Sequence, residues 1–588
     1  MAAYGAAVSL KNTIQSLLES SRISLVPPSP DILRSAYDAM CCLHNVLSKL
    51  DETGYSKIRT KVNAFDEQIK DAIWEFEDLL ESHYTDQILP QLESERDRLP
   101  FSVDLQSLWQ SVDRFIERMA VMEAEYDMEL VNMPEEEGEP LSSRIDFGGI
   151  NSEMVKLSKQ FEEVRDYILA KAEREGKYAR VNCLLLTGMA GVGKTTLVKK
   201  VFDDPSIQTH FELRAWVKVG RKCESNETLR CILAQVDPSN RDQMLTQRDD
   251  DDIKKLVGLL EERLKDKKCL IVLDDVWQWD TRLMSTLQEK NVQILVTSRL
   301  RIKDSPSYCD VRLLDKEESK RLLGEKVFGD KGFPPYLEEL GEKIAQKCEG
   351  LPLMIVTVAD LLRKANKGTG EEIDKCTQEY WTEVAEKQQS SVFVDAYNQI
   401  SKVFFPSYDY LPQIWKMLFL YLGAFLPYTN IDPHDIMCYV SAEGFCEQIG
   451  KKKLDDEVMD GLTTREFFVS HTLTELSYNY HLLLYDFDPV SWFSNKKCRL
   501  CKKEASKIKF LHVLQSCYED MKGQRRLCAH SNTLFAIKEV YDSIKSDCSS
   551  TVRSLLCHGP SHPYPVPIHA MDFKLLRVLN ARKAHEKK

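Results

Sequence analysis

The sequence lacks a long apolar segment. Its longest apolar run, Met417 to Leu426, is shorter than the roughly 20 residues that a membrane-spanning helix needs. The segment from Met1 to Glu19 holds one lysine and no cleavage-type pattern after an apolar core, so it does not predict a secretory signal. These absences predict a cytoplasmic protein.

An excess of positive charge and a regular cysteine framework are also missing. The net charge is −13, which argues against a general nucleic-acid binder, because such proteins need many cations to contact phosphates. The 17 cysteines are an odd number, and several, such as Cys183 and Cys269, stand in apolar runs. This pattern favours a reducing compartment over a disulfide scaffold. No internal repeat of convincing length is present.

The chain of 588 residues is long enough for several domains. Residues 1 to about 130 are predicted to be helical, because apolar residues recur there at three- and four-residue spacing. The members of this stripe are Ile58, Val62, Phe65, Ile69, Ile73, Phe76 and Leu80. Strand and helix patterns alternate from about 150 to 320, which indicates a parallel α/β sheet. Helical patterns dominate again up to about residue 470.

One motif predicts phosphate binding. It follows the apolar strand that ends at Thr187, precedes a helical pattern, and fits the phosphate-loop pattern G-x-x-x-x-G-K-[ST]. Glycines let the loop turn tightly, so that several backbone N–H groups and the helix N-terminus face one phosphate. Lys194 would then reach the terminal phosphates, and the Thr195 hydroxyl is placed to bind Mg²⁺. The predicted nucleotide-binding residues here are Gly188, Met189, Ala190, Gly191, Val192, Gly193, Lys194, Thr195 and Thr196.

Two further strands end in charged residues that complete such a site. The apolar run from Lys268 ends at Asp274 and Asp275. We predict that Asp274 holds Mg²⁺ together with Thr195, and that Asp275 acts as the catalytic residue that orients or deprotonates an attacking water. Arg299 follows a third strand and is predicted to sense the terminal phosphate. Standing alone, it would be an ordinary surface arginine.

A series of further blocks accompanies these motifs in order. They are Phe211 to Val219, Leu273 to Trp277, Thr297 to Arg299, Cys348 to Leu353, Tyr408 to Pro412, Phe419 to Phe425 and Ala442 to Phe445. The series resembles the NB-ARC family of plant disease-resistance proteins, intracellular immune receptors of the coiled-coil, nucleotide-binding, leucine-rich-repeat type. The late-blight-resistance-like group of that family is the most similar. Phe76 to Glu81 stands where the helical domain of these receptors carries an acidic motif.

The resemblance implies a multidomain α plus α/β fold. It places a helical coiled-coil domain at 1–133, a linker at 134–150, a phosphate-loop α/β nucleotide-binding domain at 151–315 and a small helical domain at 316–395. A winged-helix domain would follow at 396–515, and a connector with a short leucine-rich-repeat stub at 516–588.

The resemblance also implies a function in plant defence. Such receptors are closed by ADP, open when ATP replaces it, and then oligomerise and signal a hypersensitive cell-death response. ADP or ATP with Mg²⁺ would be the ligands, Pro352 would pack against the nucleotide, and hydrolysis would be slow at most. The partners implied are other immune receptors or host signalling proteins, contacted through residues 1–133. A homo-oligomer and contact with the plasma membrane would arise only on activation.

The chain departs from the family after Arg499. The family carries a His-Asp motif there, but this chain reads Cys498 to Ala505 without it, which predicts a less favoured closed state. An alternative alignment makes His512 the motif histidine, with Val513 in place of the aspartate. Cys498 and Cys501 could form half of a zinc site or be ordinary thiols.

The acidic residues and the C-terminal end raise two further expectations. We expect at most one leucine-rich repeat. The acidic residues Glu77, Asp78 and Glu81, which face basic repeat residues in the family, are therefore expected to be solvated or bound in trans. The N-terminal stripe Ala7, Leu10, Ile14, Leu17 and Leu18 has two interpretations, packing inside the bundle or membrane contact on activation.

Two other classes of function remain open at this stage. A truncated interaction scaffold, or a decoy for full-length receptors, would act through the N-terminal helices. An ATP-driven remodelling enzyme is the third possibility, but no substrate site is visible in the sequence.

Overall fold

The computed structural model describes most of the chain, in two compact units. The described residues are 1–53, 57–94, 100–134, 140–145, 158–172, 183–221, 224–246, 253–287, 291–300, 307–365, 371–387, 390–426, 433–445, 495–514, 521–530, 532–558 and 570–580. The first unit comprises residues 1–136, 411–472 and 488–588, and the second comprises residues 137–410 and 473–487. Much of the predicted linker at 134–150 and of the winged-helix domain, at 446–494, lies outside the described residues.

The second unit is built on a parallel sheet of the order β4-β5-β6-β3-β7. Its strands are β3 (Cys183–Thr187), β4 (Leu213–Lys218), β5 (Cys269–Val276), β6 (Val292–Ser298) and β7 (Tyr308–Asp310). β3, β5 and β6 are almost entirely buried, as expected for a parallel sheet covered on both faces. The alternating pattern of the sequence is therefore an α/β domain, as predicted.

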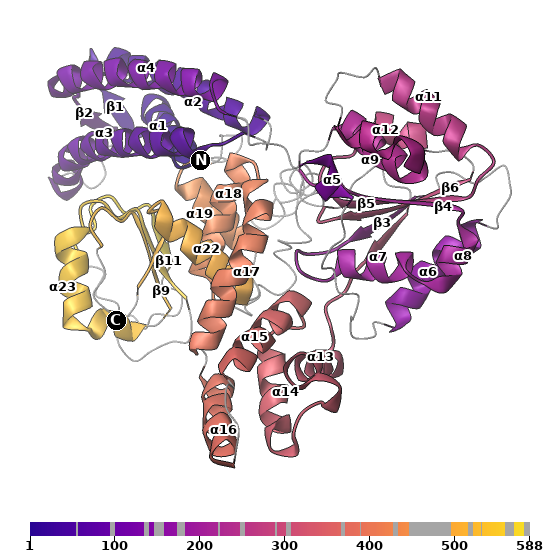
Figure 1. Ribbon diagram of the computed structural model, residues 1–588. Coiled ribbons are helices and arrows are strands. Elements are labelled where there is room, and N and C mark those ends of the chain that lie inside the picture. The colour runs from indigo at the N-terminus through magenta and orange to yellow at the C-terminus, as the bar shows by residue number, and fades with distance from the viewer. Residues whose placement is uncertain are drawn as a thin grey trace, which may run out of the picture. The chain divides into compact units, whose positions relative to one another are not determined.

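Helices cover both faces of this sheet (Figure 1). One face carries α6 (Ser158–Ala172), α7 (Lys194–Phe202) and α8 (Pro205–His210). The other carries α9 (Ser225–Val236), α11 (Ile253–Leu264) and α12 (Thr281–Leu287). The short helices α5 (Leu141–Arg144) and α10 (Arg241–Thr246) complete this part of the unit.

A run of helices follows the sheet within the same unit. It consists of α13 (Lys316–Phe328), α14 (Glu338–Lys347), α15 (Pro352–Ala365), α16 (Glu371–Glu386) and α17 (Ser391–Asp409). Asp315 and Glu318 form a capping box that starts α13, and Pro352 takes the first position of α15, where its missing N–H costs nothing.

The first unit begins with four long helices, which confirms the helical prediction for this region. They are α1 (Ala2–Glu19), α2 (Ser29–Ser48), α3 (Thr60–Ser94) and α4 (Trp109–Val131). The predicted stripe is the buried face of α3, except that Ile58 precedes the helix and is 38% exposed. Two short strands that the sequence did not predict, β1 (Ile23–Leu25) and β2 (Phe101–Val103), pair in parallel beside the helices.

Helix α1 packs inside this bundle. Ala7, Leu10 and Ile14 are fully buried, so their spacing serves packing in this state, the first of the two interpretations. None of the described helices is both long and apolar enough to cross a membrane.

The rest of the first unit joins helices to a second parallel sheet. The helices are α18 (Gln413–Tyr421), α19 (Pro433–Ala442), α22 (Asn495–Lys507) and α23 (Lys538–Asp547). The sheet has the order β11-β10-β9-β8, formed by β8 (His512–Val513), β9 (Arg526–Ala529), β10 (Ser554–Cys557) and β11 (Val578–Asn580). The sheet therefore begins before residue 516, where we placed the boundary of the connector.

This sheet contains a repeat that the sequence analysis missed. An arginine stands one residue before each of three strands, at Arg525, Arg553 and Arg577, with spacings of 28 and 24 residues. Backbone hydrogen bonds join them: Arg553 N–H donates to Arg525 O at 2.6 Å, and Arg577 N–H donates to Arg553 O at 2.7 Å. Parallel strands at such spacings are typical of stacked-repeat proteins. The sequence analysis missed this pattern, because its shared signal is only an arginine before a short apolar strand, and the number of leucine-rich repeats stays a prediction. We call these three residues the arginine ladder.

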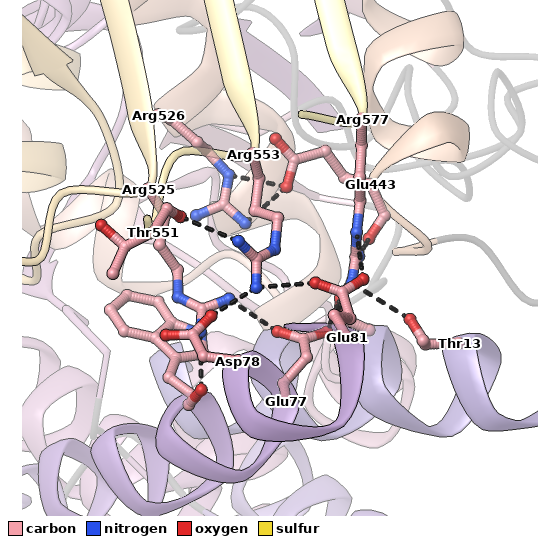
Figure 2. Close-up of polar contacts among 12 residues, drawn as sticks. Thr13, Glu77, Asp78, Glu81, Glu443, Arg525, Arg526, Thr551, Arg553 and Arg577 are labelled. Carbon is pink, nitrogen blue, oxygen red and sulfur yellow. Dashed lines mark hydrogen bonds and ion pairs between the residues drawn. The ribbon is translucent and has the colours of Figure 1, made fainter. Parts of the chain in front are cut away.

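The arginine ladder binds the acidic residues of α3 (Figure 2). Arg525 contacts Glu77 at 2.7 Å, Arg553 contacts Glu81 at 2.6 Å, and Arg577 contacts Glu77 at 2.8 Å. The side chains of Glu77 and Glu81 are 2% and 4% exposed. The expectation that these acids are solvated or bound in trans was therefore wrong, because their partners lie within the same unit.

A third buried acid connects the predicted winged-helix region to this network. Glu443, at the end of α19, is fully buried and binds both Nε (3.0 Å) and Nη2 (2.7 Å) of Arg526. Its carboxylate also accepts a hydrogen bond from the hydroxyl of Tyr421, and its backbone carbonyl accepts bonds from Ser9 and Arg577. Both donors of Arg526 reach the same oxygen, Oε2, and charge-assisted hydrogen bonds of this kind offset part of the cost of burying the two charges.

Acid should weaken this network. Burial opposes ionisation of Glu77, but Arg577, Arg525 and Arg553 together outweigh it and lower its pKa to about 2. A lowered carboxyl pKa stabilises the fold above the unfolded-state pKa and stops doing so as the pH falls towards the folded-state value. We expect the unfolding free energy of the wild type to exceed that of Glu77→Gln by a margin that shrinks, by on the order of 3 kcal/mol, between pH 6 and pH 2.

Urea unfolding followed by circular dichroism measures this margin. Glu75→Gln on the same helix is the matched control, because the Glu75 side chain is 79% exposed. Equal acid dependence in wild type and Glu77→Gln would contradict the prediction.

Candidate functional site

The predicted phosphate loop joins strand β3, which lies between β6 and β7 in the sheet, to helix α7. Gly188, Gly191 and Gly193 have φ values of +146°, +76° and +102°, which L-residues with side chains rarely adopt. A Cβ atom on Gly191 would also lie 2.7 Å from the Cβ of Leu353. Glycine is therefore required at these turns, and the loop has the form that cradles a phosphate.

The remaining loop residues line this turn in order. Ala190 and Val192 are buried, and Met189, Thr195 and Thr196 are partly exposed. The Lys194 side chain folds over the loop, where its Nζ donates to the carbonyl oxygens of Gly188 (2.6 Å) and Met189 (3.0 Å). The ammonium group is thus held at the place where phosphate oxygens would bind.

The buried carboxylate of Asp274 connects three parts of the site. Its Oδ1 accepts hydrogen bonds from the hydroxyls of Thr195, at 2.8 Å, and Thr297, at 2.6 Å. Burial raises the pKa of Asp274, and the two threonine bonds only partly offset it. The sequence analysis assigned no role to Thr297, although it stands in the block that contains Arg299. Its position between β3 and β5 follows from the strand order.

Asp275 and Arg299 lie together beside Asp274. Asp275 has a φ of +57°, and the pairing of β5 with β6 shifts register between Leu273 and Val276. Such an irregularity redirects a side chain next to a site. The Nε of Arg299 lies 3.4 Å from Oδ1 of Asp275. The structure therefore brings together every charged residue that the sequence predicted for this site.

Pro352 marks where the helical segment meets the loop. It opens α15, and the backbone N–H of the next residue, Leu353, donates to the carbonyl of Gly191 at 3.2 Å. The side chain of Leu353 covers Gly191. Pro352 itself is partly exposed beside the loop.

These residues fit a nucleotide with a divalent cation. The glycine cradle and Lys194 suit phosphates, and two hydroxyls around a buried carboxylate offer the oxygen ligands that Mg²⁺ prefers. A cation at Asp274 would also compensate the burial of its charge, which raises the pKa of this carboxyl group. When bound, Mg²⁺ would draw charge from the terminal phosphates.

Cys498 and Cys501 form no metal site with the residues that the structure describes. Cys498 and Cys501 lie buried in α22, and the Cys498 thiol contacts the carbonyl of Phe425 at 3.7 Å. Across the part of the chain that the structure describes, no three His, Cys, Asp or Glu side chains gather as metal ligands. His512, the alternative motif histidine, lies in β8 of the first unit and pairs with Leu527.

Comparison with known families identifies this domain. A family model described as NB-ARC domain matches residues 159–332. The chain carries an NB-ARC domain. The matched range includes the phosphate loop, Asp274, Asp275 and Arg299, whereas Pro352 lies outside it.

Two plant proteins illustrate which curated proteins are similar to the chain. A late blight resistance protein homolog of Solanum demissum is 25% identical over 452 residues, which cover 73% of this chain and 32% of the relative. A disease resistance protein of Arabidopsis thaliana is 31% identical over 318 residues, which cover 50% of this chain and 34% of the relative. The chain thus spans about a third of the length of the curated relatives it matches. It is a homologue of plant NB-ARC disease-resistance proteins, as predicted.

Similarity to solved structures is low. The ORC2 protein of Aeropyrum pernix, solved as ADPNP-ADP complexes, aligns with 62% of this chain and 98% of its own at 12% identity and a TM-score of 0.36. The parallel sheet and the family match, rather than this likeness, carry the description of the NB-ARC domain.

Replacing Asp274 should have opposite effects with and without ligands. We expect Asp274→Asn to melt at a higher temperature than the wild type in buffer without nucleotide or Mg²⁺, because it removes a buried charge. With Mg²⁺-ATP at about 100 times its Kd, the wild type should gain about 2.7 kcal/mol, and the part of this gain that needs Mg²⁺ should be lost in the variant.

Thermal unfolding with and without Mg²⁺ measures both effects. Asp275→Asn is the control, because we assign it to water activation and expect it to keep the gain that depends on Mg²⁺. If Asp274→Asn kept the stabilisation that depends on Mg²⁺, or melted at a lower temperature than the wild type without ligands, Asp274 would not be the buried carboxylate that binds Mg²⁺.

Proposed function

We propose that this chain is an ADP- and ATP-binding switch of plant defence signalling, with slow hydrolysis at most. The observation that carries the proposal is the joint placement of the glycine cradle, Lys194, Thr195 and Asp274 within the NB-ARC domain. The plant relatives support a role in disease resistance. The cell-death output and the oligomer on activation rest on the family resemblance.

The residues of the site have separate roles in this proposal. Lys194 and the loop N–H groups bind the phosphates, and Thr195 and Asp274 hold Mg²⁺. Asp275 orients water, and Arg299 binds the terminal phosphate. Leu353 couples the nucleotide site to the helical segment, because its N–H and side chain both contact Gly191.

Such a switch requires that the positions of its parts depend on the ligand. Each nucleotide favours the state that it contacts better, and the shift equals the difference between the two binding free energies. The phosphate loop is hydrogen-bonded to the start of α15 through Gly191 and Leu353, so a change of nucleotide at the loop would act directly on this helix.

Nucleotide should copurify with the protein and disappear with Lys194. We expect denatured wild-type protein to release ADP or ATP in near-stoichiometric amount, and Lys194→Ala to release less than a tenth as much, because the charged donor to the phosphates is gone. Chromatography of the released nucleotide makes the measurement. Lys199→Ala, on the same helix, is the control, since Lys199 pairs with Asp203 at the surface. Equal nucleotide content in wild type and Lys194→Ala would refute the proposal.

A second function, an interaction scaffold, is favoured by one surface. On α4, Val121, Met128 and Val131 are 57%, 58% and 78% exposed, and Val121 and Met128 are two turns apart on one helix face. Exposed apolar side chains in a row are typical of a face that binds another helix. In this second function the N-terminal helices bind a partner protein, and bound nucleotide is not needed for that binding.

The two functions predict opposite results from one pair of variants. If the chain is a scaffold, full-length Val121→Asp/Met128→Asp should lose defence signalling when expressed in leaf tissue, while Lys194→Ala signals normally. The switch predicts that Lys194→Ala changes signalling. Ile253→Asp, at an exposed apolar position of α11, controls for the added charge.

A further inference from the structure

The C-terminal turn of α17 contacts the predicted phosphate sensor. Nη1 of Arg299 donates to the carbonyl oxygen of Val403 at 2.8 Å and to the hydroxyl of Ser407 at 3.3 Å. Both acceptors belong to α17, which lies in the same unit as the NB-ARC site. Ser407 is 6% exposed, so water does not readily replace it.

Two neighbouring contacts hold this turn in place. Arg221 pairs with Asp409 at 3.2 Å, and the hydroxyl of Tyr410 donates to the carbonyl of Trp277 at 3.3 Å. Asp409 and Tyr410 belong to the block Tyr408 to Pro412, to which the sequence analysis assigned no function. The contacts give that block a location, at the ends of the strands that carry the site.

Trp277 contacts the arginine through its ring. The Cζ atoms of Arg299 and Arg221 lie over this ring, at 5.0 Å and 5.7 Å from its centroid. The ring is buried, and such stacking favours a guanidinium that lies flat on it. Arg299 is therefore oriented by Trp277 on one face and by α17 at Nη1, while its Nε points to Asp275.

Pro406 lies inside α17, between Val403 and Ser407. Proline has no N–H, so it cannot make the helical bond to the carbonyl of Lys402 in the preceding turn. The Val403 carbonyl lies in that turn. A carbonyl oxygen has two lone pairs and can accept Arg299 in addition to a helical bond.

We propose that α17 and the terminal phosphate of the nucleotide compete for Arg299, which makes Ser407 a positioning residue that disfavours ATP relative to ADP. The phosphate is the stronger acceptor, because hydrogen bonds to a charged group exceed those to a neutral carbonyl or hydroxyl. A diphosphate lacks this group and leaves Arg299 on α17. Binding of ATP thereby releases the turn that carries Ser407 and Asp409. This inference rests on the proposed function, because it assumes that the site binds nucleotide.

The affinity ratio for ATP and ADP tests the competition. Calorimetric titration of nucleotide-free, full-length protein with Mg²⁺-ATP and Mg²⁺-ADP gives both Kd values. Loss of one neutral hydrogen bond should shift the ratio in Ser407→Ala towards ATP by about threefold to tenfold, through tighter ATP binding. Ser407→Thr keeps the hydroxyl and should retain the wild-type ratio. Arg299→Gln should lose the dependence of affinity on the terminal phosphate that Arg299 supplies, and its Kd for ADP should equal that of the wild type.

A second readout follows α17 itself. Hydrogen exchange of the amides of residues 403–409 should be faster with ATP than with ADP in the wild type, and equal with both in Arg299→Gln. An unchanged ratio in Ser407→Ala, or a shift towards ADP, would overturn the inference. Failure of the proposed function is distinguishable, because then neither nucleotide would bind the wild type more tightly than Lys194→Ala.

Discussion

The buried carboxylate of Asp274 is the constraint on which the nucleotide site depends. Its Oδ1 accepts hydrogen bonds from Thr195, in α7, and from Thr297, on β6, so one carboxylate on β5 contacts both the start of the loop helix and the neighbouring strand. Burial raises the pKa of this carboxyl group, and the hydrogen bonds from Thr297 and Thr195 offset only part of that effect. A fold that keeps such a charge inside gains from a bound cation. The same feature that defines the geometry therefore also favours Mg²⁺.

Buried charges are also central to the first unit, but there the buried carboxylates of Glu77, Glu81 and Glu443 are paired with arginines of the same unit. The arginine ladder and Arg526 face the acids of α3 and Glu443, and most of these side chains are nearly inaccessible to water. Buried ion pairs add little net stability compared with apolar packing, but removing one partner is costly. This network of ion pairs specifies how the second sheet packs against α3, and loss of any one of its charged residues would leave a buried partner uncompensated. Glu443 extends it to α1 through Ser9.

Local signals in the sequence predicted the α/β domain and its site well. Glycine spacing, Lys194 and the acidic strand end act within a few residues of one another, and the topology of a parallel sheet then brings their strands to one edge. Thr297 and Leu353 were missed because nothing local distinguishes them. Their roles follow from the strand order and from the packing of α15 on Gly191. The contacts of Ser407 and Asp409 were missed for the same reason.

The sequence by itself determined the helical N-terminal region, the phosphate loop and the kinship with plant NB-ARC proteins, because these depend on periodicity and on short motifs. Only the tertiary structure decided the environment of Glu77 and Glu81. Their partners lie more than 400 residues away and share no pattern except an arginine before a short strand. Pairing between such distant charges depends on which surfaces the fold brings together, and no local spacing encodes that choice.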